Sequence, residues 1–343
     1  MISRRRIFFF PALSGLAGCS RSNVLRLNVF NWSNYIGPET LARFQAETGI
    51  RVRYAVYESN EEMLARAVTG NSGWDVVFPS NYFIGPMREL GLLAPLDRSR
   101  LPGLSNLAPR FSAPPWDERL QWCVPFMWGS SGILSNPRLV PPPQSFADLW
   151  DPRYNGRMTM LDDPPEVFGA ALFKLGLPLN ESSEQGLRRA FSEALKQKPL
   201  LRAYLNAEMR DQIVAGDLAV SQSWATTAQQ AIDAAPHLTF TYPREGFALY
   251  ADCAAVLRES RRPELAHRFL DFLLRPGVAA HLVEAFRAST ANAAATALLP
   301  KSLSSLETLF PKPETLARAE WFAPLPPSAQ RLRDRLWTEL KSA

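Results

Sequence analysis

The sequence predicts an α/β protein with two domains. After residue 24, strand and helix patterns alternate as β-α-β-α-β, which calls for a parallel sheet with helices on its faces. The chain has 343 residues, which is too long for one small core and suits two domains of ordinary size. A content of 46% hydrophobic and 21% charged residues is typical of a soluble globular protein.

The first strand is predicted at residues 24–30, an apolar run that ends just before two asparagines and two aromatic residues. Pro38 then opens a helix, because proline suits the first helical position, and Gly49 ends it. Residues 51–56 alternate in polarity and predict a second strand.

The third strand is predicted at residues 75–78, a short apolar run closed by a proline. Capping-box spacing in residues 59–62 predicts the helix that precedes it. If the strand order is 2-1-3, ligands bind where the chain changes direction, beyond the carboxyl ends of strands 1 and 3. The loops at residues 31–35 and 80–82 then face one crevice.

A second domain is predicted after the proline-rich connector at residues 135–145. A short helix is expected at residues 146–150, and residues 161–166 are expected to end a strand and open another helix. Further helices are predicted at 184–196, 206–215, 224–234, 263–286 with a break at 275–277, and 328–341.

The first eighteen residues have the pattern of an export signal. Residues 1–6 are basic, and residues 7–17 form an apolar stretch too short to span a bilayer permanently. This stretch ends in Leu-Ala-Gly-Cys, which resembles the bacterial lipobox, so Cys19 is expected to carry lipid and residues 19–23 to form a tether. The basic residues fit either the Sec or the twin-arginine route, and the membrane that would hold the anchor stays open.

The charge balance gives no support to a nucleic-acid-binding protein. The formal charge is +5, but removal of Arg4, Arg5 and Arg6 with the signal leaves 35 basic and 33 acidic residues, or +2. No Lys/Arg-rich block marks a nucleic-acid surface. Cys123 and Cys253 could form a disulfide outside the cytoplasm, although two free, buried cysteines are the preferred interpretation.

Catalysis and metal binding have little support in the sequence. The three histidines, His237, His267 and His281, occur without HExxH, CxxC or G-x-S-x-G motifs, and no glycine loop is suited to phosphate. A surface or helix-end role is expected for His267 and His281. No cofactor is expected, and an enzyme is the least favoured class.

Acids and aromatic residues at strand ends point instead to a cation site. Asp163 and Glu166 could be a helix cap alone or could also face a ligand. Asp252 lies in an apolar strand, where a carboxylate needs a cation or several donors, so a nearby arginine is the alternative to a ligand. Trp224 is compatible with two positions, one in the hydrophobic core and one in the ligand-binding site. Together, carboxylates for ammonium groups and aromatic faces for methylenes suit a flexible organic polycation.

These residues lie in segments that resemble the periplasmic spermidine/putrescine-binding proteins of polyamine ABC importers, over essentially the whole mature chain. Several segments match in the same order, which makes the resemblance specific. The matching segments are residues 31–35 (NWSNY), 57–61 (YESNE), 75–82 (DVVFPSNY), 146–150 (FADLW), 162–168 (DDPPEVF) and 250–252 (YAD).

The resemblance implies the two-lobed type II periplasmic-binding-protein fold, in which two α/β lobes close over a ligand. Crossing strands are then expected near residues 129, 252 and 296. The expected first lobe is 24–130 plus 253–295, and the expected second lobe is 131–252 plus 296–343.

The resemblance also implies roles for individual residues. Aromatic walls are expected from Trp32, Tyr35, Tyr82, Trp224 and Tyr250. Amines are expected to pair with Asp163, Glu166 and Asp252, and hydroxyl groups are expected from Ser33 and Ser80.

The sequence departs from the family pattern at three positions of the expected site. Asn34 stands where relatives have an acid, so one charge partner is missing and the site suits a cation with fewer or differently spaced amines. Ala288 replaces a tyrosine and Phe322 replaces a glutamine, so one end of the site is expected to be less polar.

The resemblance therefore implies a monomeric, lipid-anchored periplasmic protein that captures a polyamine and delivers it to a membrane permease. Two alternatives stay open at this point. One is a binding protein for another organic cation or an amino acid derivative, and the other is a polyamine sensor with no role in transport.

Overall fold

The computed structural model describes residues 25–343, so the predicted signal, the tether and Cys19 lie outside the described residues. The strands are β1 Arg26–Trp32, β2 Arg51–Tyr57, β3 Val76–Val77, β4 Cys123–Ser135, β5 Met158–Met160, β6 Leu201–Tyr204, β7 Val220–Trp224, β8 Thr239–Thr241, β9 Phe247–Val256, β10 Ser289–Thr290 and β11 Ala319–Trp321. The helices are α1 Pro38–Thr48, α2 Asn60–Ala67, α3 Asn81–Glu89, α4 Pro109–Ser112, α5 Pro164–Lys174, α6 Glu184–Gln197, α7 Met209–Ala215, α8 Ala225–Ala234, α9 Pro263–Leu273, α10 Pro276–Phe286, α11 Ala293–Thr296, α12 Lys301–Ser304, α13 Pro313–Leu316 and α14 Pro327–Ser342. Short 3₁₀ turns lie at 98–100, 102–106, 146–150, 152–154 and 198–200.

The first three strands have the predicted order, because β1 pairs in parallel with both β2 and β3. Helix α1 begins at Pro38 and ends against Gly49, whose φ of 71° is the left-handed conformation that glycine adopts easily. Ser59 caps α2 by accepting the Glu62 N–H, as the spacing predicted. The short helix expected at residues 146–150 is present as a 3₁₀ turn over the same residues.

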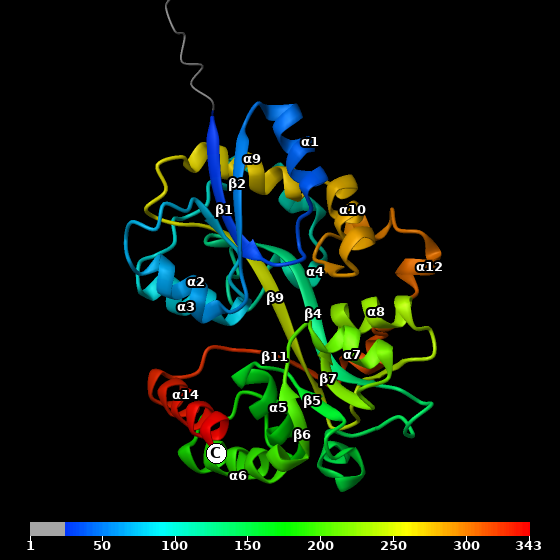
Figure 1. Cartoon of the computed structure of the whole chain (residues 1–343). Helices are drawn as coiled ribbons and strands as arrows, with labels where there is room; N and C mark the ends of the chain where they lie inside the picture. Colours follow the sequence, from blue (N-terminus) through cyan, green and yellow to red (C-terminus); the bar gives the residue numbers. More distant parts are fainter. Residues whose placement is uncertain (1–24) are drawn as a thin grey trace, which may run out of the picture.

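Two long strands join the halves of the molecule. Strands β4 and β9 pair in antiparallel fashion and run side by side from one half to the other (Figure 1). The upper part of β4 contributes Trp128 to one hydrophobic cluster, while Ile133 belongs to a second cluster. The main strand order is β2-β1-β3-β9-β4-β7-β5-β6, with β8 and β10 also paired to β4 and β11 to β9, so β4 and β9 form the centre of the sheet system.

Each hydrophobic cluster has its own helices. The first cluster contains Phe44 of α1, with Phe269 and Phe272 of α9 packed edge-on against it. The second cluster contains Phe168 of α5, and Leu336 of α14 belongs to the same cluster. The C-terminal helix α14 lies beside α6 in the lower half (Figure 1).

The segment that follows the predicted division at residue 296 packs on helix α10. Leu299, Leu303 and Leu309 pack in one cluster with Ala280 and Val283 of α10, which belong to the predicted first lobe. The chain next pairs with a crossing strand at residues 319–321, where β11 lies parallel to β9. Burial of these three leucines against α10 holds the 299–309 segment on that side. The exact allotment of residues to lobes stays a prediction.

The two remaining cysteines are free and buried, on the neighbouring strands β4 and β9. His267 is buried near the start of α9, where its Nε2 accepts the Asp97 N–H. Of the two predicted roles, a surface position or a position near a helix end, only the second applies to it. Within residues 25–343, no group of three or more metal-binding side chains is found. No helix in this range is long and apolar enough to cross a membrane.

Strands β4 and β9 pack closely against each other at Gly129. A Cβ at this position would lie 2.5 Å from Cζ of Tyr250, its partner on β9. We predict that Gly129→Ala lowers the free energy of unfolding by about 1–3 kcal/mol, because the tyrosine ring must move. The measurement is urea denaturation of the wild type and the variant. The matched control is Gly277→Ala in α10, where a Cβ meets nothing within 4 Å and should not destabilise the protein. Equal stability of the two variants would contradict the tight packing.

Candidate functional site

A cavity lies between the two halves, at the carboxyl ends of β1 and β3 and beside the crossing strands. The empty space within it is about 930 Å³, a value that includes space open to solvent. Every residue predicted for the site lines it: Trp32, Ser33, Asn34, Tyr35, Ser80, Tyr82, Asp163, Glu166, Trp224, Tyr250 and Asp252. The structure therefore brings these side chains together, and their role as ligand contacts stays a prediction.

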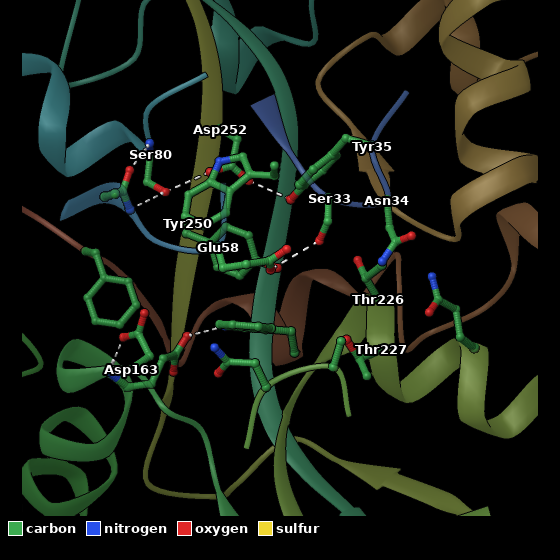
Figure 2. Close-up of a pocket in the computed structure, with 18 of the residues that line it drawn as sticks. Ser33, Asn34, Tyr35, Glu58, Ser80, Asp163, Thr226, Thr227, Tyr250 and Asp252 are labelled. Carbon is green, nitrogen blue, oxygen red and sulfur yellow. Dashed lines mark hydrogen bonds between the residues drawn. The ribbon is translucent and has the colours of Figure 1, made fainter. Parts of the chain in front are cut away.

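Asp252 is the carboxylate on the crossing strand β9, and it is 2% exposed. Its two oxygens accept hydrogen bonds from the hydroxyl groups of Tyr35 at 2.6 Å and Ser80 at 2.7 Å (Figure 2). Burial raises the pKa of Asp252 to about 6, and the two hydroxyl donors limit this rise. No ion pair to Asp252 occurs within residues 25–343, so the alternative of a nearby arginine is wrong.

A second acidic group lies at the start of α5. Asp163 caps this helix by accepting the Glu166 N–H at 3.1 Å, as the sequence predicted. Glu166 is 3% exposed, and its Oε1 accepts a hydrogen bond from the indole N–H of Trp224 at 3.0 Å. The two carboxylates thus lie within one helical turn, and both line the cavity.

The surroundings of this pair favour its neutral form. Burial raises the pKa of Asp163 to about 7, with a further contribution from the negative charge of Glu61. Burial also raises the pKa of Glu166 to about 8, and the charge of Asp163 adds to this rise. Two acids of the same charge in a region of low polarity cannot both ionise cheaply unless a cation joins them.

Aromatic rings cover the space between the acidic groups. Trp32 is held by a hydrogen bond from its indole N–H to the Phe78 carbonyl at 2.8 Å. Tyr82 packs against Phe322 with ring centroids 5.4 Å apart, and both line the cavity. Such faces cover methylene groups and attract cations. The cavity therefore has the chemistry to hold an extended chain of methylene groups that carries positive charges.

Comparison with known proteins shows the family to which the chain belongs. Residues 39–310 match the family model described as bacterial extracellular solute-binding protein. The spermidine/putrescine-binding periplasmic protein of Escherichia coli is 34% identical over 90% of this chain and 89% of its own length. The putrescine/cadaverine-binding protein of Pseudomonas aeruginosa is 31% identical over 95% of this chain and 96% of its own.

The chain belongs to the bacterial extracellular solute-binding proteins. Its fold agrees with that assignment: the spermidine/putrescine ABC transporter substrate-binding protein PotD of Streptococcus pneumoniae superposes with a TM-score of 0.81. That match covers 93% of this chain and 99% of the other, at 29% identity. The expected two-lobed α/β fold is confirmed, and the family is one of binding proteins rather than enzymes.

The cavity of this solute-binding protein also contains residues that the sequence analysis did not assign to it. They come from loop and helix starts that no local pattern marks as part of a site, although 57–61 was recognised as a family segment. They are Glu58, Asn60, Asn206, Ala207, Thr226, Thr227, Gln230 and Phe322. Phe322 was noted only as a departure from the family, while Ala288 is buried and does not line the cavity.

Glu58 and Asn60 extend the predicted constellation. Ser33 Oγ donates to Glu58 Oε2 at 3.2 Å at the exposed edge of the cavity. Asn60 Nδ2 donates to Ser80 Oγ at 3.1 Å, and Asn60 Oδ1 accepts the Ser80 N–H at 3.0 Å. Asn60 therefore orients the serine that bonds Asp252, and Glu58 places a carboxylate near Asn34.

The raised pKa of Glu166 predicts a pH dependence of stability. The pKa is about 8 in the folded protein against an ordinary value of 4.5, so the folded state holds this proton more tightly than the unfolded state. The stability associated with this proton is present at low pH and is lost as the pH rises through about 8. We predict that Glu166→Gln gains stability relative to the wild type between pH 5 and pH 8.5.

The measurement is urea denaturation of protein refolded without ligand, at several pH values. The control is Glu339→Gln on the exposed face of α14, which makes the same substitution outside the cavity. A constant difference for Glu166→Gln would contradict the interpretation.

Proposed function

We propose that this protein captures a polyamine of the putrescine/spermidine class outside the cytoplasm and delivers it to an ABC importer. The observation that carries the proposal is the set of three carboxylates, Asp163, Glu166 and Asp252, that line one cavity. None of them has an ion-pair partner within residues 25–343. Buried charges are stable only when they are paired, and the ammonium groups of a polyamine supply partners.

The proposed contacts follow from the positions of the side chains. Asp252 binds one ammonium group, with Tyr35 and Ser80 holding the carboxylate in place. Asp163 and Glu166 bind another, and the aromatic residues cover the methylene groups between them. Neutral sugars and anions do not supply the positive charge that these acids need.

Closure about the crossing strands explains how one chain captures and releases its ligand. The cavity is lined from both halves: Trp32, Tyr35 and Ser80 from one, and Asp163, Glu166 and Trp224 from the other. A cation between the halves stabilises the closed arrangement, as in hinge closure around ligands. Residues of a single chain complete the cavity, so we propose that the protein acts as a monomer.

The transport role and the location are supported by the family and by the names of the relatives. The similar proteins from E. coli and P. aeruginosa are named as binding proteins for spermidine/putrescine and putrescine/cadaverine. The similar protein from S. pneumoniae is named as the substrate-binding protein of an ABC transporter. We infer delivery to a membrane permease from these names together with the cavity chemistry.

Asp252 is the decisive residue for this function. We predict that Asp252→Asn weakens putrescine or spermidine binding by about tenfold or more, because a hydrogen bond to a charged group contributes about 1.5–3 kcal/mol. Isothermal titration calorimetry of ligand-stripped protein measures this change. The matched control is Asp217→Asn, an exposed acid after α7 that should leave the affinity unchanged. Equal affinities of the wild type and Asp252→Asn would remove the proposed role of Asp252.

We also propose that Cys19 carries lipid that holds the protein at a membrane; the support is the lipobox-like sequence at residues 16–19. Replacement of the cysteine removes the thiol that the lipid would modify. We predict that Cys19→Ala moves the exported protein from the membrane fraction to the soluble fraction, as followed by immunoblotting. Continued membrane association of the variant at the wild-type level would argue against the anchor.

A further inference from the structure

One end of the cavity differs chemically from the rest. Figure 2 shows Asn34, Thr226 and Thr227 at this end, while Asp163 lies at the other. Thr227 is 7% exposed, and its hydroxyl has no hydrogen-bond partner within the part of the chain that the structure describes. This hydroxyl at the cavity wall is therefore available to bond a ligand.

The threonines occupy the first turn of α8, which points its N-terminus at the cavity. The residue before the helix, Trp224, makes no side-chain cap, and the first turn contains no acid. The first N–H groups of a helix have no acceptor within the helix and carry a partial positive charge. An ammonium group is disfavoured here, whereas an oxygen acceptor is favoured.

A glutamine of the same helix also lines this end of the cavity. Gln230, one turn further along α8, lines the cavity, and its Oε1 accepts a hydrogen bond from the guanidinium of Arg210 at 3.3 Å. Its Nε2 donates to the Phe286 carbonyl at 2.8 Å, so the carboxamide is held in place. Arg210 therefore contacts this part of the cavity wall through Gln230, and its guanidinium also forms an ion pair with Asp211.

Two other residues at this end of the cavity limit the acceptor to a neutral group. Glu58 lies on this side of the cavity beside Ser33, and Asn34 offers a carboxamide that can both donate and accept. A ligand carboxylate would be repelled by the negative charge of Glu58. A neutral amide carbonyl meets the helix N–H groups and the threonine hydroxyl without that penalty.

We propose that the preferred ligand is a mono-N-acylated diamine, with its free ammonium at the carboxylates and its acyl amide at the N-terminus of α8. This inference rests on the proposed function, because it requires an amine-binding cavity. The amide N–H of such a ligand can donate to the Asn34 side chain, and its carbonyl can accept from Thr227. The methylene chain then lies along the aromatic rings.

The test compares four ligands on the full-length protein after refolding without ligand. These are putrescine, spermidine, N-acetylputrescine and 4-aminobutyrate, and calorimetry gives each dissociation constant. The expected result is that N-acetylputrescine binds about tenfold more tightly than putrescine, because it makes the additional hydrogen bonds. 4-Aminobutyrate should bind more weakly than N-acetylputrescine.

Two substitutions show whether the preference arises at this end of the cavity. Thr227→Val keeps the side-chain shape and removes the hydroxyl, so it should lower the ratio of N-acetylputrescine to putrescine affinity by about fivefold. Asn34→Asp restores an acid and should turn the preference toward putrescine. The control is Thr239→Val in β8, outside the cavity, which should leave the ratio unchanged.

The outcomes separate this inference from the proposed function. Tighter binding of putrescine or spermidine than of N-acetylputrescine overturns the acyl preference and leaves polyamine capture in place. Tighter binding of 4-aminobutyrate than of N-acetylputrescine overturns the claim that this end binds a neutral acceptor, and favours a ligand carboxylate there. If none of the three amine ligands without a carboxylate binds, both the inference and the proposed function are overturned.

Discussion

The pairing of β4 with β9 is the constraint on which the rest of the structure depends. These strands carry the chain between its two hydrophobic clusters, so their register fixes where the two halves face each other. Met127 lies opposite Asp252 and Gly129 lies opposite Tyr250, which places two cavity residues at the crossing itself. A one-residue shift in this register would turn Asp252 to the other face of the strand and separate it from Tyr35 and Ser80.

The cavity also brings together buried acids, and burial of each one in its charged form costs free energy unless a cation pairs with it. The pKa of Asp252, Asp163 and Glu166 is raised by burial, and their neighbours are mainly hydroxyl groups, aromatic rings and other acids. Such a site binds a cation because the cation pairs with the buried carboxylates and so offsets the free-energy cost of burying them. The end at α8 differs, because the first turn of that helix contains no acid and the one carboxylate nearby, Glu58, is exposed. A ligand that fits the whole cavity must therefore differ at its two ends.

Local patterns in the sequence were sufficient for much of the fold and for the acidic part of the site. The alternation of strands and helices gave the order β2-β1-β3, and the spacing of Asp163 and Glu166 gave the start of α5. Contacts between distant segments were not accessible in this way. The packing of residues 299–309 on α10 and the position of Thr227 at the cavity both depend on how remote elements meet. No residue type or spacing within those segments signals the contact.

The central claim is that this cavity holds an organic amine, and the most direct test is to identify what the protein carries when it is purified from its own cells. Native mass spectrometry would measure the mass of the complex, and denaturation followed by mass spectrometry would identify the released compound. The account predicts one equivalent of a polyamine or an acylated polyamine, which Asp252→Asn fails to retain. A bound sugar, peptide or anion, retained equally by Asp252→Asn, would contradict it.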